Sequence, residues 1–91
     1  MDLGLGDRVF VVTGGSRGLG LATARVLVSE GARVVLAARD EATLHEAVAE
    51  LGGGDHAVGL PTDLTDADAA ERLPAAAIAR FGRLDGALLS V

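Results

Sequence analysis

The chain has 91 residues, a formal net charge of −5 and eight basic residues, all of them arginine. This acidic balance, with Phe10 and Phe81 as the two aromatic residues, argues against a nucleic-acid partner, since such proteins carry basic patches and aromatic stacking platforms. The absence of cysteine excludes disulfides, thiol catalysis and cysteine–zinc sites.

The N-terminal sequence MDLGLGDRVFVV has no basic region before its apolar run, so it does not resemble a secretory signal. No apolar run approaches the roughly 20 residues of a membrane-spanning helix. A length of 91 residues, 49% of them hydrophobic, fits one small domain or part of a larger one. These features predict a cytoplasmic protein with no membrane partner.

Apolar runs typical of strands alternate with helix-like segments along the chain. Residues 8–13, with the sequence RVFVVT, form a β-branched run that predicts a strand buried on both faces. A helix follows a glycine-rich turn and is expected to end at Gly31. Its apolar face is predicted to carry Leu19, Ala22, Thr23, Val26 and Leu27. Residues 32–38 predict the second strand.

The second helix is expected to begin after Asp40, whose side chain is suited to an N-cap. Apolar residues recur at helical spacing and predict its buried face: Leu44, Ala47, Val48 and Leu51. The three glycines at 52–54 end this helix. A short third strand is predicted over residues 56–60, closed by Pro61.

The third helix is expected to begin at Thr65 or Asp66 and to continue to about Phe81. Pro74 lies inside this segment and cannot donate a hydrogen bond to the carbonyl of Ala70, so we expect either a kink or a restart with Pro74 in a first turn. An apolar stripe is still predicted along it, formed by Pro74, Ala77, Ile78 and Phe81.

Gly82 is expected to end the third helix, and residues 84–91 predict a fourth strand with Asp85 fixing the turn before it. This alternation predicts right-handed βαβ units and a parallel sheet. The expected fold is therefore α/β, a partial doubly wound Rossmann-type sheet in the order βαβαβαβ, with strand order 3-2-1-4. Residues 1–91 would form the N-terminal part of one such domain, ending in the fourth strand.

The turn TGGSRGLG, residues 13–20, fits one of the known phosphate-binding patterns. A P-loop requires Lys and Ser or Thr after its last glycine, but Leu21 and Ala22 follow here. The pattern G-x-G-x-x-G requires a glycine at position 16 or 23, where the chain has Ser16 and Thr23. The spacing that fits is T-G-x-x-x-G-x-G.

Each glycine of this pattern has a physical role in holding a nucleotide. Gly14 permits a tight turn, Gly18 lets the backbone approach a pyrophosphate, and Gly20 lets the helix pack close to the sheet. The N-terminus of the helix presents free N–H groups and partial positive charge to the anion. The alternative interpretation is a glycine-rich turn without a ligand.

Three motifs resemble the short-chain dehydrogenase/reductase family, and together they span nearly the whole chain. TGGSRGLG resembles the cofactor loop of this family, TDLTD at 62–66 its Asp-hydrophobic pair, and RFGRLDGALLSV at 80–91 its lead into the fourth strand. The resemblance implies that Asp63 and Leu64 border the adenine, with Asp63 accepting from its amino group. It also implies cofactor contacts from the loop residues Gly14, Ser16, Arg17, Gly18, Leu19 and Gly20.

The end of the second strand favours NADP over NAD. An NAD site usually has a carboxylate there for the ribose 2′-hydroxyl, whereas this chain has Ala38 followed by Arg39. Arg39 can offer its planar guanidinium to a 2′-phosphate, and Arg17 can approach from the other side, as in NADP-preferring members of the family. The alternative is that both arginines are solvated surface residues.

The chemistry of the family depends on a Tyr-x-x-x-Lys pair and a serine, but this chain has neither tyrosine nor lysine. We therefore predict no catalytic residue and no metal site in it. The residues Leu89, Ser90 and Val91 also stand where the family commonly has Asn-Asn-Ala-Gly.

The chain is interpreted as the NADP(H)-binding part of a longer oxidoreductase that interconverts alcohols and carbonyls. Its substrate, and any homo-oligomer, would belong to the parent protein. Two alternatives stay open: a non-catalytic dinucleotide-binding module, and a truncated, inactive fragment.

Overall fold

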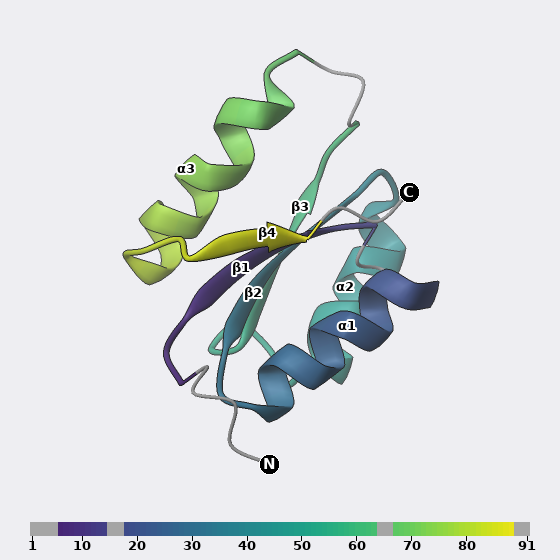
Figure 1. Ribbon diagram of the computed structural model, residues 1–91. Helices are drawn as coiled ribbons and strands as arrows, with labels where there is room; N and C mark the ends of the chain where they lie inside the picture. The colour runs from purple at the N-terminus through teal and green to yellow at the C-terminus, as the bar shows by residue number, and fades with distance from the viewer. Residues whose placement is uncertain (1–5, 15–17, 64–66, 89–91) are drawn as a thin grey trace.

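The computed structural model describes residues 6–14, 18–63 and 67–88. Its elements, in chain order, are β1 (Val9–Thr13), α1 (Gly18–Ser29), β2 (Arg33–Ala38), α2 (Glu41–Glu50), β3 (Ala57–Pro61), α3 (Ala69–Phe81) and β4 (Gly86–Leu88). In this part of the chain the strands form one parallel sheet in the order β3-β2-β1-β4. Helices α1 and α2 cover one face and α3 the other (Figure 1). The predicted fold class and strand order are confirmed.

Strand β2, which lies between β1 and β3, is buried on both faces. Val34 and Leu36 point toward α1 and α2, while Val35 and Ala37 point toward α3, and all four are 0% exposed. Two clusters of buried residues therefore form the core. The cluster under α1 and α2 contains Val12, Ala24, Leu27, Ala32, Val34, Leu36, Leu44, Ala47, Leu51 and Ala57. The cluster under α3 contains Val9, Val11, Val35, Ala37, Leu73 and Ala77.

The apolar face predicted for α1 is only partly right, since Leu27 is buried as predicted but other predicted members are not. Its buried residues are Gly20, Ala24 and Leu27, whereas Leu19 is 76% and Val26 54% exposed. Small side chains on the buried face allow the helix axis to come close to the strands, and this close approach outweighs the burial of the larger residues.

Helix α2 follows the prediction closely. Asp40 is its N-cap, with extended backbone angles, and its Oδ1 accepts hydrogen bonds from the backbone N–H of Ala42 at 2.9 Å and of Thr43 at 3.4 Å. The helix buries Leu44 and Ala47, as expected. It ends before glycines with φ of +105° and +87° at 52 and 53.

Helix α3 begins later than predicted. Thr65 and Asp66 lie outside the described residues, and the helix starts at Ala69, where the carbonyl of Asp68 accepts from the backbone N–H groups of the first turn. Pro74 consequently lies in the second turn, so the predicted restart with Pro74 in a first turn is wrong. Gly82, with φ +84°, ends the helix as expected.

The apolar stripe predicted for α3 is only partly right. Ala77 is buried, and Pro74 and Phe81 are half-buried, but Ile78 is 57% exposed. The residues that reach the sheet are Ala69, Leu73 and Ala77, because the later start and the orientation of the helix select positions four residues apart.

Asp85 joins the start of β4 to the start of β1. Its backbone N–H donates to the carbonyl of Val9 at 2.8 Å, and its Oδ2 accepts from the backbone N–H of Val9 at 2.8 Å. The guanidinium of Arg83 donates to both carboxylate oxygens, at 2.8 and 2.6 Å. The hydrogen bonds from Arg83 and then from Val9 lower the pKa of Asp85 below its ordinary value. Asp85 thus fixes two strands as well as the turn.

Candidate functional site

The carboxyl ends of β1, β2 and β3 lie at one edge of the sheet, which we call the carboxyl edge. In the register of the sheet, Thr13 lies beside Ala37, and Ala38 lies beside Pro61. Because parallel strands all run the same way, the turns that follow these strands emerge together. Residues far apart in the sequence are therefore brought to one place.

The turn after β1 is bounded by two glycines in the left-handed region. Gly14 has φ +67° and Gly18 has φ +62°, a conformation that side chains with a Cβ rarely adopt. The N–H of Gly14 donates to the carbonyl of Ala37 at 2.7 Å, which attaches the turn to β2. Ser16 and Arg17, two of the predicted cofactor contacts, lie outside the described residues.

The first turn of α1 lies at the carboxyl edge and is formed by glycine and leucine residues. A Cβ built on Gly18 would meet no atom of the described residues within 4 Å, so that side of the turn is open toward them. The first turn contains no acidic residue to oppose an anion. Leu19 is exposed and Gly20 is buried. The burial of Gly20 agrees with the expectation that a glycine there lets the helix pack close to the sheet. The free backbone N–H groups and the positive end of the helix dipole suit a phosphate here.

Arg39 and Asp63 lie side by side on the carboxyl edge. Arg39 follows β2 and Asp63 follows β3, and Nη2 of the arginine is 3.8 Å from Oδ2 of the aspartate. The Arg39 side chain is 80% exposed and the Asp63 side chain 46% exposed. Leu64, predicted with Asp63, lies outside the described residues. The structure therefore brings together two predicted site residues that are 24 positions apart in the sequence.

Thr62 holds the turn that carries Asp63, and the sequence analysis missed it. Thr62 is 2% exposed; its N–H donates to the carbonyl of Ala38 at 2.7 Å, and its Oγ1 donates to the carbonyl of Leu60 at 2.9 Å. The first bond joins the end of β3 to Ala38, the residue directly before Arg39, and the second holds Thr62 against β3 itself. The signal available in the sequence was a threonine directly after the proline that closes a strand.

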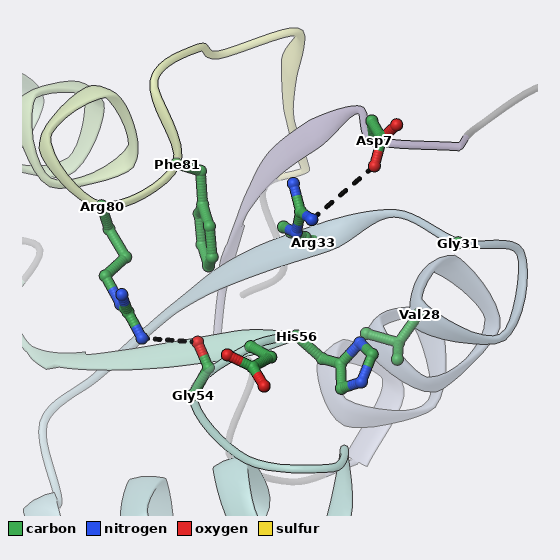
Figure 2. Close-up of a pocket in the computed structure, with 9 residues that line it drawn as sticks. Asp7, Val28, Gly31, Arg33, Gly54, His56, Arg80 and Phe81 are labelled. Carbon is green, nitrogen blue, oxygen red and sulfur yellow. Dashed lines mark hydrogen bonds and ion pairs between the residues drawn. The ribbon is translucent and has the colours of Figure 1, made fainter.

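A separate cavity of about 640 Å³ lies at the opposite edge of the sheet. Figure 2 shows Arg33 and Arg80 on either side of the Phe81 ring, with guanidinium carbons 5.9 and 5.7 Å from its centroid. Asp7 and Asp55 also line the cavity, so its lining contains two acidic side chains beside the two arginines. This cavity belongs to the amino-terminal ends of β2 and β3, so it is not part of the glycine turn.

Within 6–14, 18–63 and 67–88, no helix is both long and apolar enough to cross a bilayer. The same ranges contain no cluster of three or more His, Cys, Asp or Glu side chains suited to a metal ion.

Comparisons with known proteins identify the family. The family model for short chain dehydrogenases matches residues 8–89. An uncharacterized oxidoreductase of Mycobacterium bovis is 44% identical over 81 residues, which are 89% of this chain and 33% of the relative. The L-rhamnose 1-dehydrogenase (NAD(P)(+)) of Azotobacter vinelandii is 43% identical over 86 residues, 87% of this chain and 33% of that protein.

A solved structure of a short chain dehydrogenase has the same fold over nearly the whole of this chain. The crystal structure of a short chain dehydrogenase from Bacillus anthracis superposes with a TM-score of 0.88 at 28% identity, covering 96% of this chain and 36% of that one. The chain spans about a third of the length of these relatives. It belongs to the short-chain dehydrogenase family.

Proposed function

We propose that this chain is the NADP(H)-binding part of a short-chain-type oxidoreductase that interconverts alcohols and carbonyls. The family implies a nicotinamide dinucleotide as cofactor. The observation that carries the proposal is the carboxyl edge itself. Glycines with φ +67° and +62° bound the turn between β1 and α1 there, and Arg39 and Asp63 follow the next two strands. In this proposal residues 1–91 are the N-terminal part of a single dinucleotide-binding domain.

The glycine turn would hold the linked phosphates of the dinucleotide. Backbone N–H groups of the first turn of α1 would donate to them, and the open side of Gly18 leaves room for their approach. By the family pattern, Ser16, Arg17 and Leu19 add contacts from the same turn. A ligand-free glycine turn would not require a helix N-terminus that is free of acidic side chains.

Arg39 would select the cofactor that carries a 2′-phosphate. It follows Ala38, so no carboxylate at the end of β2 opposes a phosphate on the adenosine ribose. A guanidinium forms charge-assisted, often bidentate, hydrogen bonds with phosphate. Asp63, from the end of β3, would accept from the adenine amino group, with Leu64 beside it.

The dinucleotide, when bound, would donate a hydride to a carbonyl carbon in its reduced form, or accept one from an alcohol carbon in its oxidised form. The residues of this chain would bind it and orient it. We assign proton transfer and substrate recognition to other parts of the parent enzyme, because the chain contains neither tyrosine nor lysine. In that proposal the carbonyl or alcohol substrate, and any homo-oligomer, belong to the parent enzyme.

The test is calorimetric titration of the folded chain with NADPH and with NADH, for the wild type and for Arg39→Asp. We expect the variant to lose about tenfold to a hundredfold in NADPH affinity, the value of hydrogen bonds to a charged group, while NADH is spared. Arg72→Asp is the matched control, since Arg72 is exposed on α3 and forms no ion pair with any residue that the structure describes.

Two results would contradict the proposal. If the folded wild type binds neither nucleotide, the dinucleotide site is wrong. If Arg39→Asp weakens NADPH and NADH equally, Arg39 does not read the 2′-phosphate. Equal losses in Arg39→Asp and Arg72→Asp would point to a general effect of net charge.

A further inference from the structure

We infer that Asp63 limits the preference of this site for a 2′-phosphate, because it pairs with the same guanidinium that the phosphate would bind. This inference rests on the proposed function. It gives Asp63 a second role, as a specificity-determining residue, beside its proposed contact with adenine. The opposite view is that Asp63 helps the phosphate by holding Arg39 ready for it, and the two views predict changes of opposite sign.

The sheet register and the bonds of Thr62 bring Arg39 and Asp63 together at the carboxyl edge. Ala38 lies beside Pro61 in the sheet register, so the residues that follow β2 and β3 emerge next to each other. Thr62, buried and bonded to the carbonyls of Ala38 and Leu60, fixes the turn directly before Asp63. Both side chains lie at the surface, since that of Arg39 is 80% exposed and that of Asp63 is 46% exposed.

Electrostatics decides the direction of the effect. At 3.8 Å the carboxylate of Asp63 offsets part of the charge that Arg39 presents to an incoming anion. A phosphate on the same guanidinium must either displace this carboxylate or accept it as a close negative neighbour. Both cases weaken phosphate binding. The effect is moderate, because an exposed ion pair is screened by water and salt.

The nucleotide without the extra phosphate separates this role from the contact with adenine. NADH does not carry the group that competes for Arg39, so its affinity reports the adenine side of the site. The ratio of the dissociation constants for NADH and NADPH therefore isolates the 2′-phosphate. In Asp63→Asn the amide oxygen keeps an acceptor in place while the negative charge is removed.

The experiment measures this ratio by calorimetry for the wild type and Asp63→Asn. We expect Asp63→Asn to raise the preference for NADPH by about 1.5-fold to fivefold, the range of a screened, exposed charge pair. The gain should shrink at high salt and should be smaller in the Arg39→Ala background than in the wild type. Asp55→Asn is the matched control: Asp55 is exposed at the opposite edge and has no ion pair within the described chain.

The possible outcomes are distinct. An unchanged or lowered ratio in Asp63→Asn, with NADPH still bound by the wild type, overturns this inference and leaves the proposed function intact. A rise of the same size in Asp55→Asn also overturns it, because the effect would then be one of net charge. If the folded wild type binds neither nucleotide, the proposed function and this inference fall together.

Discussion

The glycine turn can be tested with two glycines that share a backbone conformation but lie at opposite edges of the sheet. Gly18 has φ +62° and opens α1 at the carboxyl edge; Gly53 has φ +87° and lies in the loop before β3. A Cβ on either one would meet no atom within 4 Å in the part of the chain that the structure describes. Gly18→Ala and Gly53→Ala therefore introduce the same kind of backbone strain without a steric clash.

The cost in stability should be similar for the two variants. A left-handed conformation costs an alanine about 1–2 kcal/mol, and the restricted unfolded chain returns about 0.4–1 kcal/mol. The net loss in the free energy of unfolding is then about 1 kcal/mol for each variant. For a domain of this size that loss lowers the melting temperature by roughly 4–8 °C. Urea titration followed by circular dichroism measures it.

The cost in binding should differ sharply. The methyl group in Gly18→Ala occupies the open space through which the phosphates would approach the amides of α1. Loss of one hydrogen bond to a charged group weakens binding by about tenfold or more, so calorimetry should show at least this drop for NADPH. Gly53→Ala should bind like the wild type. Equal affinities for the two variants would refute the assignment of the phosphates to this turn.

The remaining predictions concern the core and the strand junction. Leu27→Ala should lower the free energy of unfolding by about 2–5 kcal/mol because Leu27 is buried, whereas Val26→Ala, at an exposed position, should stay within about 0.5 kcal/mol. Urea titration of the two variants tests which face of α1 is buried. Equal losses in the free energy of unfolding would support the face predicted from the sequence. Asp85→Asn should reduce stability at neutral pH, because the carboxylate accepts from Arg83 and from the N–H of Val9. Since the folded pKa of Asp85 is lowered, its contribution is complete above the unfolded value of about 4 and disappears as the pH falls through the folded value. Melting curves from pH 7 to pH 2 should therefore show that the melting temperature falls less with acid in Asp85→Asn than in the wild type. An equal fall in both proteins would contradict a contribution from the charged Asp85 carboxylate.

The order of the elements was predictable because the signals for it are local. Apolar runs, glycines with positive φ and the Asp40 cap each act within a few residues, and the structure agrees with them. The start of α3 was not predictable in the same way. Thr65, Asp66 and Asp68 are all suitable caps, and sequence spacing does not rank them. In the structure the helix starts at Ala69, and Ala69 and Leu73 are buried. We infer that this tertiary packing determines where the helix begins.

The site was predictable as a set of residues but not as a set of contacts. Strand ends place Arg39 and Asp63 at one edge, and this follows from the parallel sheet alone. Their pairing depends on the register of β2 with β3 and on the two hydrogen bonds of Thr62. Neither is visible in a single sequence, which is why Asp63 was assigned to adenine and not also to Arg39.

Leu19 shows how a wrong prediction about packing can bear on function. Helical spacing placed it on the buried face of α1, while the family resemblance placed it against the cofactor, and one side chain cannot satisfy both. The structure leaves Leu19 76% exposed in the first turn, and the small Gly20 lies against the sheet in its place. An exposed leucine gains nothing from the core, since its apolar surface stays in water. That position is therefore compatible with the proposed cofactor contact and incompatible with the periodic pattern that predicted its burial.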